Sequence, residues 1–143
     1  MCLVSLKINF YIVNSIMSEK TKQINVYCKL FTDLLIELGR LYPDDNSLKV
    51  LQMTVNGMIL ISSESFVIQV IDFLEPYSEK ILAQDEQFFI TELHSDFEDN
   101  SFVYDEIKRI HTIWIDPKTT DNTKKCIWKY FKNFIKLGQM IKK

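Results

Sequence analysis

The stretch NTKKCIWKYFKNFIKLGQMI, residues 122–141, decides the fold class of this chain of 143 residues. When successive residues are placed 100° apart, its apolar and aromatic side chains gather on one side of a helix. These are Ile127, Tyr130, Phe131, Phe134, Leu137 and Ile141. The opposite side, which we call the lysine face, carries Lys125, Lys129, Lys132 and Lys136. The stretch therefore predicts a long amphipathic helix with one side in a core and the other in solvent.

Four other segments repeat their apolar residues with the spacing of a helix. They cover residues 24–41, 48–59, 66–74 and 107–114, and a shorter helical turn is expected at 78–84. Pro43 should end the first of them, because proline disfavours the helical conformation in the residue before it. A side chain among residues 45–47 can cap the second helix, and a serine among residues 62–65 can cap the third. The expected fold is therefore all-α, a compact bundle of about five helices.

Charge is distributed very unevenly, although the net charge is only −2. Residues 81–107 hold eight Asp or Glu and no Lys or Arg, whereas residues 108–143 hold ten Lys or Arg and two Asp or Glu. Opposite charges of this size concern binding partners and orientation rather than the fold. They would allow two copies of the chain to associate head to tail.

The acidic block lies within DEQFFITELHSDFEDNSFVYDE, residues 85–106. Residues 88–90, Phe-Phe-Ile, are apolar enough to insert into the helical core. Residues 94–100 are then expected to form a hydrated acidic loop that leads to the fourth helix. The candidate acidic interaction surface in this loop consists of Asp96, Glu98 and Asp99.

A metal site in the same stretch is disfavoured. An EF-hand loop that starts at Asp96 would need glycine at its sixth position and glutamate at its twelfth, where this chain has Ser101 and Ile107. Glu92, His94 and Asp96 alternate, so an extended segment would direct them to one side, but no further ligand is identifiable. We therefore expect no metal and no cofactor, and this trio is only a minority hypothesis.

Catalytic motifs are not recognisable in the sequence. Gly39, Gly57 and Gly138 are isolated, so the chain cannot form a phosphate-binding loop or a nucleophile elbow. His111 lies on the same helical side as apolar residues, which favours a partly buried structural histidine over a catalytic one. We therefore expect no enzymatic activity and no catalytic residue.

The three cysteines, Cys2, Cys28 and Cys126, are far apart in the sequence. No pair has the spacing of a zinc-binding motif, and a disulfide framework is not indicated. Cys28 and Cys126 fall on apolar sides of expected helices, so we predict reduced thiols in the core. This pattern favours an intracellular protein.

The first 16 residues have a different character from the rest. Alternate positions from Val4 to Ile12 are apolar, and a period of two is typical of a strand. Lys7 and Asn9 interrupt the run, so it is a poor signal peptide and too polar to span a membrane. Three interpretations stay open: an appendage that packs on the bundle, a strand that pairs with another chain, or an extension upstream of a start at Met17. The expected organisation is an extension at 1–16, strand-like or disordered, and a single helical domain at 17–143.

The lysine face has three interpretations. A row of ammonium groups can neutralise the phosphates of nucleic acid, and such binding depends on salt but not on sequence. It can bind an acidic protein surface, including the acidic stretch of a second copy. It can also be the ordinary solvated side of an amphipathic helix, which is the commonest case. The only arginines are Arg40 and Arg109, so specific recognition of bases is not expected.

A resemblance that covers most of residues 24–141 rests on four elements, FTDLLIELGRLYPDD, VIDFLEPYSEKILAQDEQFF, IKRIHTIW and KKCIWKYFKNFIKLG. Their order resembles small helical proteins of unassigned function that large nucleocytoplasmic (giant) DNA viruses encode. In those proteins a first helix ends at a Tyr/Phe-Pro turn, an Asp-Glu-x-Phe-Phe element follows a Pro-Tyr turn, and an Ile-Trp-Lys-Tyr helix closes the domain. The resemblance implies a viral protein located in the host-cell cytoplasm or in the virion. It implies no activity and no cofactor.

Two functions follow as predictions. The first is a non-enzymatic viral helical protein that acts as a protein–protein interaction module or as a minor virion component. Its partner would be another protein or a second copy of the chain. The alternative is a nucleic-acid-associated protein without sequence preference that uses the lysine face. No association with a membrane is expected, because the aromatic residues of the last helix are better explained as core.

Overall fold

The computed structural model describes residues 18–88 and 102–143, and it describes side chains for residues 18–88 and 108–143. In these residues the α-helices are α2 (Glu19–Leu41), α3 (Asn46–Ile61), α4 (Ser63–Leu74), α5 (Ser78–Leu82), α7 (Phe102–Ile115) and α8 (Asp121–Lys142). A 3-10 helix at Glu75–Tyr77 joins α4 to α5, and the described residues form no strand. The prediction of an all-α bundle of about five helices is confirmed, since all but α5 have 12 or more residues. The predicted extension at 1–16 and the acidic loop at 94–100 lie outside the described residues.

Capping side chains set the starts of four helices. Each cap accepts a hydrogen bond from the backbone N–H three residues further on, and so satisfies a donor that the helix leaves free. The caps are Ser18 of α2, Asp45 of α3, Ser62 of α4 and Thr120 of α8. The predicted caps of the second and third helices are thus confirmed. α2 begins at Glu19, ahead of the predicted start at residue 24, because its first turn is polar and lacks the apolar period.

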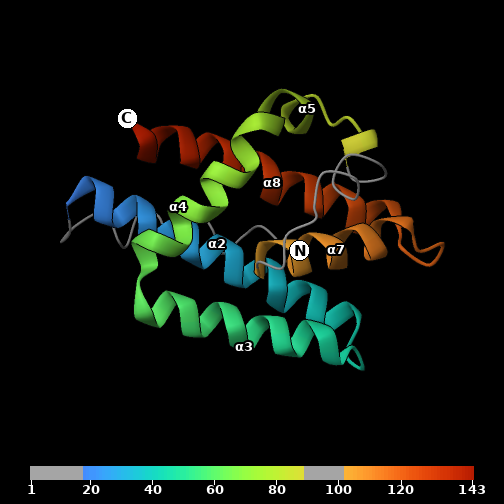
Figure 1. Ribbon diagram of the computed structural model, residues 1–143. Coiled ribbons are helices and arrows are strands. Elements are labelled where there is room, and N and C mark those ends of the chain that lie inside the picture. The colour runs from blue at the N-terminus through green and yellow to red at the C-terminus, as the bar shows by residue number, and fades with distance from the viewer. Residues whose placement is uncertain (1–17, 89–101) are drawn as a thin grey trace.

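α2 is the central helix of the bundle. It packs against α3, α4 and α8, and it lies between α3 and α8 in Figure 1. The sequence predicts one apolar stripe on this helix, but Val26, Cys28 and Leu30 are buried in addition to that stripe. A helix with neighbours on several sides buries more than one side, and this explains the difference.

Aromatic rings join α2, α4 and α8 into one core. The ring centre of Phe134 in α8 lies 5.3 Å from that of Tyr27 and 5.6 Å from that of Phe31, both in α2. Phe31 makes an edge-to-face contact with Phe66 of α4, with 5.0 Å between the ring centres. Aromatic pairs at these separations attract one another beyond the effect of area burial. The predicted aromatic side of the last helix is therefore confirmed as core.

The apolar insertion predicted at 88–90 is confirmed at Phe88. Its side chain is fully buried, and its ring centre lies 5.2 Å from that of Tyr77 and 6.4 Å from that of Phe131 in α8. Residues 89 and 90 lie outside the described residues. Phe88 thus anchors the beginning of the acidic stretch to the core.

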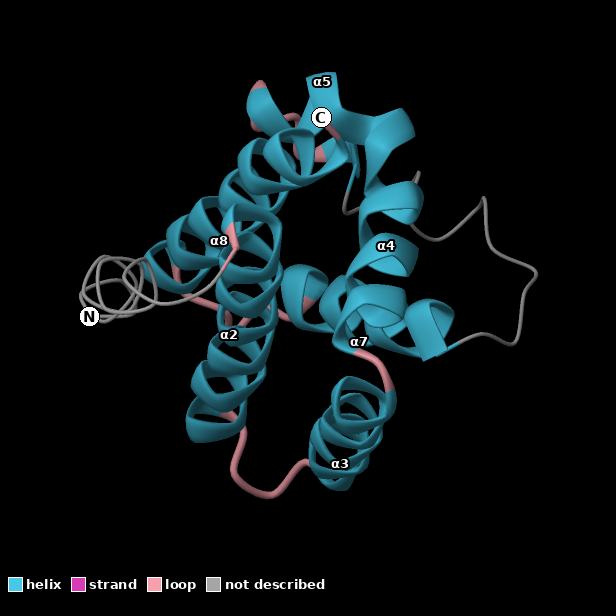
Figure 2. Cartoon of the chain, turned by 90° about the vertical axis from the view of Figure 1, so that its left-hand side faces the viewer, coloured by secondary structure: helices cyan, strands magenta, loops and turns pink. Residues whose placement is uncertain are grey.

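α3 lies at the periphery, along the lower edge of the molecule in Figures 1 and 2. It packs against α2, α4 and α7. Only Leu48, Leu51 and Val55 of its 16 residues are buried, whereas α4 buries five of 12. A large part of α3 therefore faces solvent.

Candidate interaction surfaces

α8 presents the lysine face to solvent, as predicted. Lys125, Lys129 and Lys136 are exposed, and no hydrogen bond or ion pair joins them to other described residues. Lys132 is half-buried, and its Nζ donates a hydrogen bond of 2.8 Å to Gln84 Oε1. Three of the four ammonium groups are thus accessible to an acidic protein or to phosphates.

Two predictions about the acidic stretch concern residues that the structure does not describe. One is the candidate acidic surface of Asp96, Glu98 and Asp99. The other is the metal hypothesis, which involves Asp96 together with Glu92 and His94. Within the described part of the chain, no three His, Cys, Asp or Glu side chains are grouped so that they could hold a metal ion. The acidic surface and the metal trio therefore stay predictions.

The described cysteines differ from each other. Cys28 is free and buried, as predicted, and burial raises its pKa from 9.0 to about 11, against the opposing effect of a hydrogen bond with Ser63. Cys126 is half-buried and disulfide-bonded, so the prediction of a reduced thiol is wrong at this position. An apolar helical position indicates burial, but it does not indicate whether a second thiol is close enough to form a bond. His111 is half-buried, as expected for a structural histidine.

A polar cluster that the sequence pattern did not reveal joins α7 and α8 to the segment before residue 89. The indole Nε1 of Trp114 donates a hydrogen bond of 3.0 Å to Glu86 Oε1. Lys124 Nζ lies 3.4 Å from the same oxygen and 5.2 Å from the centre of the Trp114 ring, a cation–π distance. Because Glu86 and Lys124 are 38 residues apart, no local spacing could predict the contact.

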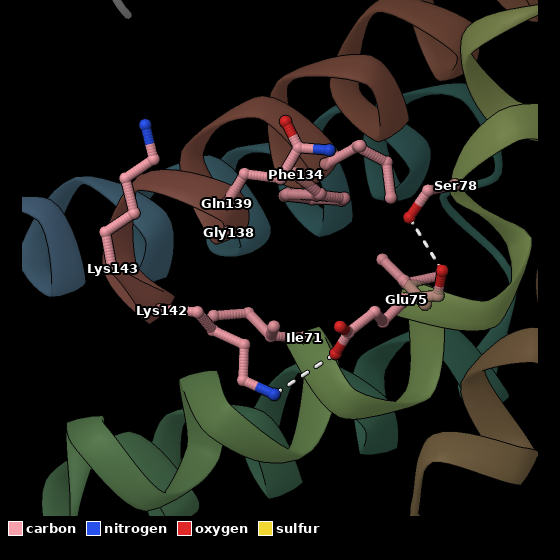
Figure 3. Close-up of a pocket in the computed structure, with 10 residues that line it drawn as sticks. Ile71, Glu75, Ser78, Phe134, Gly138, Gln139, Lys142 and Lys143 are labelled. Atoms are coloured by element: carbon pink, nitrogen blue, oxygen red, sulfur yellow. Dashed lines mark hydrogen bonds and ion pairs between the residues drawn. The ribbon is translucent and has the colours of Figure 1, made fainter.

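An open cavity of about 290 Å³ lies between α4 and the C-terminal end of α8 (Figure 3). Ile71 and Phe134 contribute apolar surface to its lining. At its rim, Lys142 Nζ lies 2.7 Å from Asp72 Oδ1 and 3.1 Å from Glu75 Oε2, and both contacts raise the pKa of Lys142. The charges at this rim therefore pair with one another, and the rest of the lining combines apolar side chains with polar ones such as Ser78 and Gln139.

The solvent side of α3 carries an apolar surface that we call the outer face of α3. Its members are Val50, Met53, Thr54, Gly57, Leu60 and Ile61. Their spacing places them on one side of the helix, opposite the buried side. The exposed fractions of Val50, Met53, Leu60 and Ile61 are 61%, 74%, 87% and 88%.

Size and lack of charge distinguish the outer face of α3 from ordinary exposed apolar residues. No charged residue occurs between Val50 and Ile61, so the four side chains form a continuous patch. Single exposed apolar residues are normal, but a patch of roughly 500 Å² is near the upper end for monomeric proteins and is often functional. The sequence contained a signal for it, because the helical pattern at 48–59 left several apolar residues without a place in the core.

None of the helices in residues 18–88 and 102–143 is long and apolar enough to cross a membrane.

Gly57 leaves a gap in the middle of the outer face of α3. A Cβ atom built at this position would meet no other atom within 4 Å. Packing within the molecule therefore does not require a glycine here. A glycine in a helix interior is nevertheless destabilising by about 0.5–1 kcal/mol relative to alanine.

A groove of about 490 Å³ separates α3 from α7 beside the outer face. Polar groups of both helices line it, among them Thr54 of α3 and Thr112 of α7. Arg109 of α7 forms an ion pair with Asp45, the cap residue of α3, and both side chains are largely buried. This ion pair fixes α7 against the start of α3.

Comparisons with known proteins give no match: no family model, no curated protein and no solved structure is similar to the chain. The resemblance to proteins of giant DNA viruses therefore stays a prediction.

Proposed function

We propose that this chain is a protein–protein interaction module whose contact surface is the outer face of α3. The observation that carries the proposal is the exposed, uncharged patch of Val50, Met53, Leu60 and Ile61. Apolar surface in water is unfavourable by about 25 cal/mol per Å², and burial against a partner recovers this free energy. Contiguous patches of this kind commonly mark association sites.

The chemistry of the outer face of α3 favours a protein partner over phosphates or lipid. A surface for phosphates needs Lys or Arg, and the outer face contains neither. Helices that lie on membranes combine an apolar side with a polar side rich in Lys and Arg, whereas Lys49 is the only basic residue of α3. The partner is therefore expected to present an apolar helix or groove of its own.

The test combines Met53→Glu with Leu60→Glu, because these two side chains are 74% and 87% exposed. A matched control places glutamates at Ile115 and Met140, which are exposed apolar residues of other helices. Both variants should keep a melting temperature close to that of the wild type, since surface changes usually alter stability little. Circular dichroism checks this condition.

Chemical cross-linking of the purified proteins, alone and in extracts of expressing cells, gives the readout. The wild type and the control should form the same adducts, and the Met53→Glu/Leu60→Glu variant should lose them. Identical adducts from all three proteins would contradict the proposal.

Binding of nucleic acid without sequence preference is a second candidate function, and the lysine face favours it. Lys125, Lys129 and Lys136 are exposed and make no ion pair with the described residues. Three phosphate contacts would release counterions, so the affinity for duplex DNA should fall roughly 40-fold between about 50 and 200 mM salt.

A salt titration with a labelled duplex tests this second function. Changing the three exposed lysines to Glu should remove binding. Three Lys→Glu changes at exposed positions outside the lysine face, Lys49, Lys118 and Lys143, serve as the control with equal charge and should bind more tightly than the first variant. An affinity that does not depend on salt, or an equal loss in both variants, would exclude the lysine face as the site.

The viral setting is part of the proposal and is supported by the resemblance alone. It implies that the association takes place in the host-cell cytoplasm or during assembly of the virion, where the chain would be an adaptor or a minor component. Mass spectrometry of purified virions would detect a virion component. Its absence from virions, with presence in infected cells, would favour the adaptor.

A further inference from the structure

We infer that the outer face of α3 binds the same face of a second copy of this chain, in an antiparallel helix pair with Thr54 opposite Gly57. The inference rests on the proposed function, because it names the partner of the same surface. It follows from the order of side-chain sizes along α3, from the free space over Gly57, from the area of the face and from the charges at its ends.

Four of the six residues of the outer face of α3 are arranged with the symmetry that a self-complementary interface needs, and the other two, Met53 and Leu60, lie beside them. In a two-fold interface the same surface is used by both copies, so that residue i meets residue j and j meets i. When the pair is centred on the middle of residues 50–61, Val50 lies opposite Ile61 and Thr54 lies opposite Gly57. Branched apolar side chains thus meet at both ends, and the two smallest residues of the face meet at the centre.

Gly57 allows a close approach at that centre. The distance between packed helices depends on the side chains at their contact, so small residues let two backbones come nearer. Within one copy, nothing lies within 4 Å of a Cβ built at Gly57, and the space above it is free for a second helix. Contact with a second copy accounts for a glycine that intramolecular packing does not require.

The area of the face determines how strong the association can be. If each copy contributes roughly 500 Å² of apolar surface, the pair buries on the order of 1,000 Å², near the lower limit for a specific interface. An interface of this size is typical of weak and reversible complexes. We therefore expect a dimer with a Kd on the order of 10 µM.

Electrostatics favour the antiparallel orientation over the parallel one. Antiparallel helices bring the positive end of one macrodipole beside the negative end of the other. Lys49 lies at the start of the outer face, and Glu64 lies in the first turn of α4, just beyond the end of α3. Both side chains are exposed, and Glu64 forms an ion pair of 3.2 Å with Lys20 of α2 in the same copy. An antiparallel pair brings Lys49 near Glu64 of the second copy, whereas a parallel pair places like charges side by side.

Sedimentation equilibrium of the purified chain, from about 1 to 300 µM, tests the inference because a weak dimer forms only in the upper part of this range. The wild type should follow a monomer–dimer equilibrium. Gly57→Gln places a long side chain at the centre of the pair, so it should weaken dimerisation at least about tenfold. The same change should leave the melting temperature of dilute protein unchanged or higher, which separates loss of contact from loss of fold. Ile115→Glu combined with Met140→Glu should leave the Kd unchanged.

Charge reversal tests the orientation. Lys49→Glu and Glu64→Lys should each weaken the dimer in the antiparallel arrangement, because each creates two contacts between like charges. The double variant should recover the wild-type Kd. Single changes without effect, or a double variant that is weaker than either single one, would show that the helices are not antiparallel.

A wild type that stays monomeric at about 300 µM overturns the inference, since a weak interface of the inferred size would be largely formed there. A dimer that Gly57→Gln leaves unchanged overturns it as well. If the monomeric chain still forms adducts with another protein, and Met53→Glu with Leu60→Glu removes them, the proposed function stands and the second copy is the wrong partner. If that double variant changes neither self-association nor adducts, the proposed function and the inference fail together.

Discussion

Gly57 and Gly138 both lie inside a continuous helix, yet a side chain would meet very different surroundings at the two positions. At Gly57 nothing lies within 4 Å of a built Cβ, whereas at Gly138 the Cγ1 of Ile71 would be only 3.2 Å away. Gly138 is buried where α8 packs on α4, so there the missing side chain lets two helices of the same chain approach each other. The two glycines should therefore respond to the same substitution with opposite sign.

Gly57→Gln should raise the free energy of unfolding of dilute protein by about 0.5–1 kcal/mol, because glutamine is a better helix former than glycine. Gly138→Gln should lower it by about 1–3 kcal/mol, because the new atoms enter a packed region beside Ile71. Urea denaturation at one low protein concentration measures both changes. An equal loss at both positions would show that Gly57 is packed within a single copy.

Cys28 makes the stability of the fold depend on pH. Burial disfavours its thiolate and raises its pKa to about 11, so the folded chain keeps this proton at pH values where the unfolded chain loses it. The contribution to stability is fully present below the unfolded pKa of about 8.5–9. It is lost as the pH rises through about 11.

We expect the free energy of unfolding to fall between about pH 9 and 11 and the Cys28→Ala variant to show a smaller fall over the same range. That variant has lower stability throughout, since it lacks a buried side chain, so the slope and not the absolute value is the readout. Urea denaturation at several pH values provides it. A slope that is unchanged in Cys28→Ala would assign the effect to another group, such as Tyr130, whose pKa burial also raises.

At the scale of the helices, Asp45 holds two elements together at the start of α3. One carboxylate oxygen accepts a hydrogen bond of 3.1 Å from the Leu48 N–H, and the other forms the ion pair with Arg109 of α7. Thr120, in contrast, interacts with Thr123 of its own helix, whose N–H donates a hydrogen bond of 3.2 Å. The two caps therefore differ by one contact between helices.

Asp45→Ala should lower the free energy of unfolding by about 2–3 kcal/mol, because it removes both the cap and the partner of Arg109. Thr120→Ala should lower it by about 1 kcal/mol, which is typical for a cap alone. Asp45→Asn keeps the cap and should fall between them. Urea denaturation compares the three variants, and equal losses from Asp45→Ala and Thr120→Ala would mean that the ion pair adds nothing.

Most of the helices were predictable because the signals that form them are local. The last helix is expected at 122–141 and is found at Asp121–Lys142, since its apolar period is readable in the sequence. The start of α2 was misplaced because a polar first turn has no apolar period. The apolar period of a sequence indicates which segments can form a helix, but it does not indicate how many neighbouring helices pack against each one.

The surfaces were harder to predict than the helices for the same reason. α3 has apolar residues on two sides, and the pattern at 48–59 indicates that several of them have no place in the core, but it does not indicate what covers them. The contact of Glu86 with Trp114 and Lys124 depends on elements that are 28 and 38 residues away, so only the fold brings these groups together. The lysine face was predictable because a single helix contains it completely.

At the scale of the whole molecule, the lysine face and the outer face of α3 belong to helices on opposite sides of α2, as Figures 1 and 2 both show. The lysine face also points away from α2, because the aromatic side of α8 packs against that helix. A dimer formed through α3 would therefore leave two lysine faces accessible. Linked sites of this kind bind a long ligand more tightly than a short one.

If both surfaces function, the wild type should bind a DNA of about 60 base pairs more tightly than one of about 10 base pairs. The difference in affinity should be larger than the greater number of binding positions on the long DNA accounts for. Gly57→Gln should remove this excess for the long DNA and leave binding of the short DNA unchanged. Fluorescence anisotropy above and below the Kd of the dimer provides the measurement. An excess that persists in Gly57→Gln would show that the two surfaces act independently.

The packing of α2 against α8 has a consequence for the synthesis of this chain. α2 ends at Leu41 and α8 ends at Lys142, so α2 is complete roughly 5–20 s before its main neighbour at ordinary rates of translation. During this interval Tyr27, Phe31 and the apolar residues around them have no α8 to cover them, because contacts between distant segments form last. The nascent chain is therefore expected to expose apolar core residues until α8 has been synthesised. Chaperones that bind nascent chains would then determine how much of the protein reaches the folded state.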